Sequence, residues 1–300
     1  MPIILNTPID QEFIVKLIAI ARLAGDAIIN IYNAPEKVNI KIKSDQSPLT
    51  AADLAAHNII VEALAKLLPI PIISEEAVLP NFTERKTWQH YWLVDPLDGT
   101  KEFIARTGEF TVNIALIQNG IPVLGVVHVP LVDETYIGVD KNIGVDQKSC
   151  AEKYRNGKKV NDLKTRSLDV RFAAQLHLDV LASARHGNEA TAALLQEISL
   201  YWPGSLQLLN AGSSLKFCWI AEGRADFYPR LAPTCEWDTA AAQAVLVAAG
   251  GTVVDTKNFL PLGCNGNENL LNPSFFAFGD ILFEWVSLLK KASVTSSRNL

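Results

Sequence analysis

The segment 92–100, Trp-Leu-Val-Asp-Pro-Leu-Asp-Gly-Thr, constrains the fold more than any other part of the chain. The apolar run 91–94 has the length of a buried strand and breaks at an Asp-Pro pair. Asp95 and Asp98 then lie three positions apart in a loop closed by Gly-Thr. A strand that ends in two carboxylates and open amides suits a metal-bound phosphate. An ordinary surface turn is the alternative, because Asp-Gly is a common turn dipeptide.

The composition fits a globular protein that binds a small ligand rather than a nucleic-acid polymer. Hydrophobic residues make up 49% and charged residues 20% of the 300 positions, enough for one large domain or two ordinary ones. The formal net charge is -5 without a long basic run, so no non-specific nucleic-acid surface is expected. A polyanionic substrate remains compatible if bound cations supply positive charge locally.

The sequence predicts a cytoplasmic protein. The first residues lack the basic and long apolar regions of a secretory signal. The most membrane-like stretch, residues 13–32, carries charged side chains and is predicted to be an amphipathic helix, so no stable membrane insertion is expected. Peripheral association with the inner membrane and a homodimer are left open. The cysteines form no C-x-x-C pair and are expected to be reduced: Cys150, Cys218, Cys235 and Cys264.

The first half predicts helices and an antiparallel sheet. A first helix is expected to open at Thr7-Pro8, where the missing N–H of proline costs little. A second helix is expected from the capping-box-like Thr50 and Asp53 to about Leu68. Asn119-Gly120 indicates a hairpin. The strands are expected at 38–42, 69–73, 91–94, 111–118, 123–129 and 135–139.

The second half alternates strands and helices more closely. Strands are expected at 179–183, 225–229, 252–254 and 274–278, and helices at 189–200, 213–222, 238–249 and 281–290. The polar segment 140–167 is interpreted as a long connection with one irregular strand, and so as the domain boundary. The sequence therefore predicts an α+β domain with the metal-binding loops over 1–140 and an α/β domain over 141–300.

Several acidic residues lie at the edges of predicted elements. Glu75 and Glu76 follow a strand, Asp238 begins a helix, and Asp45 precedes one. Two magnesium ions need several carboxylate oxygens, and element edges are where such ligands converge. Taken singly, Glu75-Glu76 is also typical of a solvated acidic pair, Asp238 of a helix cap, and Asp45 of a loop residue.

Other chemistries have weaker support. The five histidines show no H-E-x-x-H or H-x-H spacing, so zinc is not expected, and neither a G-x-S-x-G elbow nor a P-loop occurs. Gly212-Ser213-Ser214 before a helix favours either an anion site or an ordinary serine cap.

Three separated motifs resemble the magnesium-dependent, lithium-sensitive inositol monophosphatase superfamily. They are Asp-Pro-Leu-Asp-Gly-Thr-Lys-Glu-Phe at 95–103 with Ser-Glu-Glu before it, Gly-Ser-Ser-Leu-Lys-Phe-Cys at 212–218, and Glu-Trp-Asp-Thr-Ala at 236–240. Together with residues 108–116, they are similar to the bacterial CysQ-type 3'(2'),5'-bisphosphate nucleotidases. The resemblance runs from the first to the last predicted helix and is thin over 140–179.

The resemblance implies a layered α-β-α-β-α fold with the site between two domains. It also implies that two or three Mg²⁺ ions bind per site. Glu75, Asp95 and the Leu97 carbonyl would hold the first ion, and Asp95, Asp98 and Asp238 the second. Gly99 and Thr100 would bind the scissile phosphate. Thr100 with Asp45 would orient or deprotonate the attacking water.

By the same resemblance, the substrate is a small phosphorylated nucleotide. The subgroup hydrolyses the 3'-phosphate of 3'-phosphoadenosine 5'-phosphate to AMP and phosphate, a reaction of sulfur metabolism. Ser183 and His186 lie where relatives carry Ser-x-Ser-His, and Arg185 replaces the second serine. Gly212 and Lys216 are further candidates for substrate contacts, although Lys216 is equally typical of a solvated helix lysine.

Three alternatives remain at this stage. Inositol monophosphate or fructose bisphosphate could be the substrate of the same fold. A haloacid-dehalogenase phosphatase would need its two aspartates two positions apart, whereas Asp95 and Asp98 are three apart with Pro96 between them. A non-catalytic phosphate-binding module would be favoured by the loss of a ligand, but all the ligand positions are filled.

Overall fold

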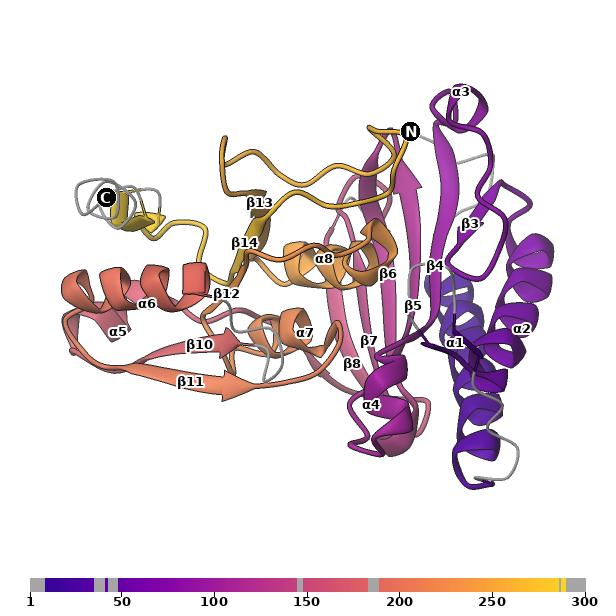
Figure 1. Cartoon of the computed structure of the whole chain (residues 1–300), viewed down its shortest axis with the longest axis horizontal. Coiled ribbons are helices and arrows are strands. Elements are labelled where there is room, and N and C mark those ends of the chain that lie inside the picture. The colour runs from indigo at the N-terminus through magenta and orange to yellow at the C-terminus, as the bar shows by residue number, and fades with distance from the viewer. Residues whose placement is uncertain are drawn as a thin grey trace.

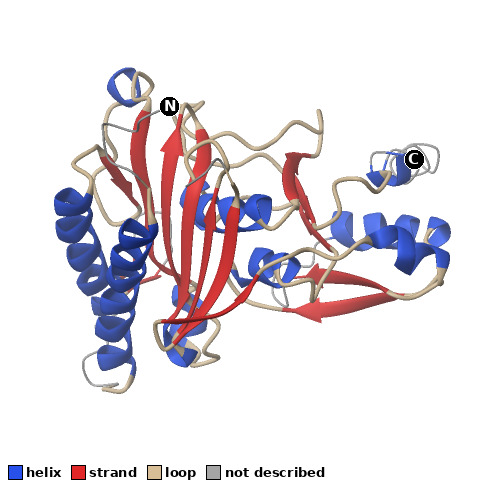
Figure 2. Ribbon diagram, turned by 180° about the vertical axis from the view of Figure 1, so that it is seen from behind, coloured by secondary structure: helices blue, strands red, loops and turns tan. Residues whose placement is uncertain are grey.

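Two β-sheets alternate with layers of helices in the structure, a computed structural model (Figure 1). It describes residues 9–34, 41–42, 48–144, 148–182, 189–285 and 287–289. Two long helices cover one face of the larger sheet, two shorter helices lie between the sheets, and further helices cover the far face of the smaller sheet (Figure 2). The expected α-β-α-β-α order is confirmed.

The outer layer consists of α1 (Gln11–Tyr32) and α2 (Ala51–Leu67). The first helix begins later than Thr7-Pro8 because Asp10 is its N-cap and accepts a hydrogen bond from the amide of Phe13 at 2.9 Å. The capping box predicted for Thr50 and Asp53 is confirmed. In the part of the chain that the structure describes, no helix has both the length and the apolar character needed to span a membrane.

The larger sheet has seven strands in the order β3-β4-β5-β6-β7-β8-β9. Its hairpin between β5 and β6 turns at Asn119-Gly120, both with positive φ, as predicted. Before it, β1 (Lys41–Ile42) and β2 (Pro48–Leu49) form a separate ribbon. The seven strands are β3 (Ile72–Ser74), β4 (His90–Asp98), β5 (Thr111–Gln118), β6 (Ile121–Val129), β7 (Glu134–Val139), β8 (Cys150–Arg155) and β9 (Lys158–Asp162).

The segment 140–167 differs from the prediction of a connection with one irregular strand. It adds a hairpin of two strands, β8 and β9, to the larger sheet, with a register shift between Lys153 and Tyr154. The turn between them is Asn156-Gly157, again with positive φ at both residues. This second Asn-Gly dipeptide lies between the charged residues Arg155 and Lys158. The larger sheet thus continues past residue 140, and the division into domains at that residue remains a prediction.

The smaller sheet has the order β11-β10-β12-β14-β13, with parallel pairing around β10 and antiparallel pairing around β14. Its strands are β10 (Leu178–Ala182), β11 (Leu206–Asn210), β12 (Phe227–Arg230), β13 (Thr252–Asp255) and β14 (Phe275–Phe278). The other helices are α3 (Phe82–Arg85), α4 (Thr100–Ile104), α5 (Leu168–Ala173), α6 (Glu189–Tyr201), α7 (Leu215–Ala221) and α8 (Ala240–Ala248), with short 3-10 turns η2 (Pro130–Val132) and η4 (Glu236–Asp238).

Helix α8 lies directly on the larger sheet, at two glycines. A Cβ atom on Gly125 would lie 2.0 Å from the carbonyl oxygen of Ala241, and one on Gly138 would lie 2.4 Å from the Cα of Val245. Small residues on both sides allow this approach, since α8 is rich in alanine. The contact fixes the start of α8, and with it η4 and Asp238, against the sheet that carries Asp95.

We expect Gly138→Ala to lower the free energy of unfolding by about 1–3 kcal/mol, because the added methyl group must displace the backbone of α8. Urea denaturation measures this difference. Gly266→Ala is the control, since nothing lies within 4 Å of its added Cβ. A Gly138→Ala protein as stable as the control would contradict the close packing of α8 on the sheet.

Candidate metal and phosphate site

Strand β4 carries the predicted metal loop at its end. The strand does not stop at Asp95-Pro96 as predicted but continues to Asp98 with a shifted register between the two aspartates. Within the irregularity, the amide of Leu97 donates to Asp95 Oδ1 at 3.0 Å. Gly99 then takes φ 90°, and α4 starts at the next residue. The proline thus distorts the strand locally, because it cannot donate to the ladder.

Three aspartates converge from two distant parts of the chain. Asp95, Asp98 and Asp238 each offer a carboxylate oxygen, and these oxygens lie within 4.8 Å of one another. Asp98 Oδ2 accepts the amide N–H of Ser214 at 2.7 Å. Asp238 Oδ2 accepts the amide N–H of Cys235 at 2.8 Å. These hydrogen bonds hold two of the carboxylates in place without neutralising them.

The three carboxylates repel one another in a buried setting. Burial and the charges of Glu75, Asp98 and Asp238 hold the pKa of Asp95 well above its usual range. Burial is also the main reason that the pKa of Asp98 rises to about 6. Burial, with the charge of Asp98, raises the pKa of Asp238 as well. A cluster of hard oxygen donors with this electrostatic cost fits a divalent cation such as Mg²⁺.

The remaining predicted metal and phosphate residues surround this cluster. Glu75 follows β3, donates its amide N–H to the carbonyl of Val94 at 3.1 Å, and has its carboxyl hydrogen-bonded to Asp95. The Leu97 carbonyl accepts the Thr100 hydroxyl at 3.3 Å. The parallel pairing of β3 with β4 brings Glu75 to this place. The structure therefore brings together Glu75, Asp95, Leu97, Asp98, Thr100 and Asp238.

Asp53 is a site residue that the sequence reasoning missed. The Thr100 hydroxyl donates to Asp53 Oδ1 at 3.2 Å, while Asp53 Oδ2 caps α2 through the Thr50 amide at 2.7 Å. Burial raises the pKa of Asp53 despite these hydrogen bonds. The predicted capping box uses only Asp53 Oδ2, which leaves Asp53 Oδ1 for Thr100. Asp45, which was assigned to Thr100, lies outside the described residues.

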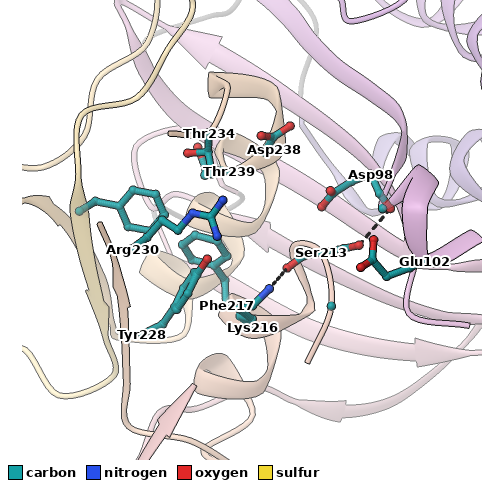
Figure 3. A pocket seen from close by; sticks show the side chains of 13 residues that line it. Asp98, Glu102, Ser213, Lys216, Phe217, Tyr228, Arg230, Thr234, Asp238 and Thr239 are labelled. Atoms are coloured by element: carbon teal, nitrogen blue, oxygen red, sulfur yellow. Dashed lines mark hydrogen bonds between the residues drawn. The ribbon is translucent and has the colours of Figure 1, made fainter. Parts of the chain in front are cut away.

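A pocket beside the cluster has cationic groups on its other side (Figure 3). Lys216 from α7 and Arg230 from β12 line it together with Asp98 and Asp238. Burial lowers the pKa of the Lys216 ammonium group to about 8, while the charge of Asp98 opposes that shift. Lys216 is thus a pocket residue rather than a solvated helix lysine. No motif in the sequence pointed to Arg230.

The Gly212-Ser213-Ser214 turn does not form the predicted serine cap through a side chain, and its role as an anion site stays a prediction. Ser214 is the N-cap of α7 but makes no capping hydrogen bond with its side chain, and its amide is taken by Asp98. The Ser213 hydroxyl instead donates to the carbonyl oxygens of Asp98 at 3.0 Å and Glu109 at 2.8 Å. Gly212 lines the pocket. Ser183 and His186 lie outside the described residues.

Comparisons with known proteins agree with these features. A model of the inositol monophosphatase family matches residues 10–272. The 3'(2'),5'-bisphosphate nucleotidase CysQ of Escherichia coli strain K12 is 43% identical over 257 residues, which cover 85% of this chain and 95% of that protein. These matches confirm the family that the sequence motifs resemble.

Solved structures show the same fold. CysQ from Bacteroides thetaiotaomicron, described as a bacterial member of the inositol monophosphatase family, aligns with a TM-score of 0.73 at 38% identity, covering 90% of this chain and 98% of that one. An inositol monophosphatase (IMPase) from Thermotoga maritima aligns with a TM-score of 0.64 at 20% identity, covering 94% and 96%. The second likeness concerns the fold alone.

We expect the metal-free protein to lose stability as the pH rises from 4 through 6. The pKa of Asp98 is about 6 in the folded protein and 3.8 ordinarily, so the folded state holds this proton more tightly than the unfolded state. The resulting stabilisation is complete below pH 3.8 and is lost as the pH rises through 6. Asp98→Asn should reduce this loss, which Asp95 and Asp238 share, and raise the melting temperature at pH 7 by roughly 5 °C. Thermal unfolding with a chelator present measures both effects.

The exposed Asp169→Asn serves as the matched control, and its melting curve should follow that of the wild type at every pH. Mg²⁺ should stabilise the wild type more at pH 8 than at pH 6, because the cation then binds carboxylates that have already lost their protons. A wild type and an Asp98→Asn variant with the same pH dependence would contradict the repulsion.

Proposed function

The chain belongs to the inositol monophosphatase family, and from this premise we propose that it is a magnesium-dependent 3'(2'),5'-bisphosphate nucleotidase. In this reaction a water oxygen attacks the phosphorus of the 3'-phosphate of 3'-phosphoadenosine 5'-phosphate. The bond from phosphorus to the 3' oxygen breaks, and AMP and phosphate leave. The family match and the names of the CysQ relatives support this assignment.

The observation that carries the proposal is the division of charge in one pocket. Asp98 and Asp238 lie on one side, and Lys216 and Arg230 on the other (Figure 3). A carboxylate cluster binds a phosphate only through metal ions, whereas ammonium and guanidinium groups bind one directly. The pocket therefore suits a substrate with two phosphate groups, one at each side.

We assign the cation ligands to residues that the structure brings together. Glu75, Asp95 and the Leu97 carbonyl would hold one Mg²⁺, and Asp95, Asp98 and Asp238 a second. Bound Mg²⁺ supplies a lowered pKa for water and positive charge for the phosphate oxygens. A third ion stays part of the proposal without a ligand set of its own.

Thr100 and Asp53 form the proton-accepting pair in this proposal. Asp53 accepts the Thr100 hydroxyl at 3.2 Å, so the hydroxyl oxygen keeps a lone pair for a proton of the attacking water. The threonine proton then passes to Asp53, whose pKa is raised by burial and so lies closer to the range of a general base. Gly99 and Thr100 lie where the scissile phosphate would bind, at the start of α4.

The second phosphate would bind to Lys216 and Arg230. The Lys216 Nζ lies 3.2 Å from the Ser213 carbonyl and 5.4 Å from the centroid of the Tyr228 ring, so these groups orient the ammonium group. Arg230 is held by hydrogen bonds from its guanidinium to the carbonyls of Ala232 and Pro233. Inositol monophosphate has no second phosphate to offer these cations, whereas fructose bisphosphate has one.

The cellular setting is part of the same proposal. All four cysteines are free thiols, which favours the reducing cytoplasm. The homodimer remains a prediction.

We expect 3'-phosphoadenosine 5'-phosphate to release phosphate only with Mg²⁺, and faster than inositol 1-phosphate or fructose 1,6-bisphosphate at equal concentration. The physical reason is that the nucleotide offers one phosphate to the carboxylate side and a second to Lys216 and Arg230, whereas inositol 1-phosphate has no second phosphate. A phosphate-release assay with the three substrates measures this. A preference for inositol 1-phosphate would keep the metal site and overturn the assignment of the nucleotide.

We expect Lys216→Gln to raise the KM for 3'-phosphoadenosine 5'-phosphate about 10- to 100-fold, because a charge-assisted hydrogen bond to phosphate is lost. The KM for 3'-AMP, which lacks the second phosphate, should change less than threefold. Lys101→Gln, an exposed lysine on α4, is the control and should leave both values unchanged. Equal losses with both substrates would show that Lys216 does not bind the second phosphate.

A further inference from the structure

Arg85 at the end of α3 is a fully buried arginine that binds a distant loop. Its guanidinium donates to the side chain of Asn265 and to the carbonyls of Asn267 and Glu268, the former carbonyl at 3.0 Å. In return, Asn265 Nδ2 donates to the Arg85 carbonyl at 2.6 Å. These partners belong to residues 264–272 of the connection between β13 and β14, called the bridging loop below.

The bridging loop crosses from the smaller sheet to the end of the larger one. Figure 1 shows the connection between β13 and β14 reaching the end of the larger sheet near α3, and Figure 2 shows the same from behind. The amide of Cys264 donates to the carbonyl of Gly120 in the β5–β6 turn at 2.7 Å. Arg85 and the hairpin turn thus anchor the loop to the sheet that carries Asp95 and Asp98.

The same loop holds the segment that carries Asp238. Glu236 donates its amide N–H to the carbonyl of Leu270 at 2.8 Å and accepts the amide N–H of Asn265 at its Oε2, also at 2.8 Å. Asn272 Nδ2 donates to the carbonyl of Cys235 at 2.9 Å and to the hydroxyl of Thr239 at 3.0 Å. Asp238 is therefore held from both sides by the bridging loop.

Burying the Arg85 guanidinium between α3 and the bridging loop is energetically unfavourable by itself. Removing an arginine from water costs several kcal/mol, and an apolar side chain of similar volume often stabilises a fold as well or better. What the guanidinium adds is direction, because its planar fork fixes three acceptors at once. Here all three acceptors belong to the bridging loop, so Arg85 fixes the position of that loop. The loop in turn hydrogen-bonds Glu236, two residues before Asp238.

We propose that Arg85 is a positioning residue of the metal site, which sets Asp238 at its distance from Asp95 and Asp98 through the bridging loop. This inference rests on the proposed function, since it requires that the three aspartates bind a divalent cation. Arg85 touches none of the proposed ligands, so it acts on metal affinity and not on the proton transfer at Thr100. Residues that orient metal ligands in this way typically change affinity by about 10- to 100-fold.

The test measures metal binding without turnover. Mn²⁺ binding to the full chain is followed by isothermal titration calorimetry for the wild type, Arg85→Lys and Asn265→Gly. Glycine is chosen because Asn265 has φ 61°, which alanine would strain. Both variants should raise the Kd for Mn²⁺ by about tenfold or more. If Arg85→Lys fails to fold, Asn265→Gly alone decides, since it keeps the arginine and removes the one side chain among its three acceptors.

Arg166→Lys is the matched control for a simple loss of stability. Arg166 is likewise held in the fold by its guanidinium, which donates to both carboxylate oxygens of Asp226, the residue before β12, at 2.5 Å and 2.7 Å. The Arg166→Lys variant should have a lower melting temperature than the wild type and an unchanged Kd for Mn²⁺. A stability loss with unchanged Mn²⁺ affinity in the Arg85→Lys and Asn265→Gly proteins would overturn the inference and leave the proposed function standing. Equal Mn²⁺ binding by the wild type and Asp98→Asn would overturn both.

Discussion

Repulsion between one buried carboxylate, Asp95, and two half-buried ones, Asp98 and Asp238, is the constraint on which the rest of this structure depends. Asp95, Asp98 and Asp238 come within 4.8 Å of one another although burial and like charge raise the pKa of each. Such an arrangement persists only when the surrounding elements leave the carboxylates no freedom to separate. Helix α8 restrains Asp238 through its contact with Gly125 and Gly138 of the larger sheet. The bridging loop restrains it through hydrogen bonds to the segment around Glu236.

The pocket beside these aspartates has an acidic side and a cationic side, which suit phosphate in different ways. On the acidic side the protein contributes only oxygen ligands, so a phosphate binds there only as a partner of metal ions. On the other side, Lys216 and Arg230 line the pocket with cationic groups that need no metal ion to attract an anion. Under the proposed function, the pocket would distinguish substrates by the distance between their two anionic groups.

The sequence predicted what is local and missed what depends on distant contacts. The loop 95–100 was recognised because its carboxylates, proline and glycine lie within six residues, and Asn119-Gly120 because a turn of this type needs positive φ. Arg230 carried no signal, since its place in the pocket follows from the order of strands in the smaller sheet. Asp53 was predicted from the sequence only as part of the capping box of α2. The fold shows that it also accepts the Thr100 hydroxyl.

That double use of Asp53 links the enzyme's chemistry to the first turn of one helix. One carboxylate oxygen closes the capping box of α2, and the other receives the hydroxyl of Thr100. A local opening of the first turn of α2 would therefore separate Thr100 from its hydrogen-bond partner before the core unfolds. If Asp53 is the proton acceptor proposed above, activity would then be lost at a lower temperature than the fold.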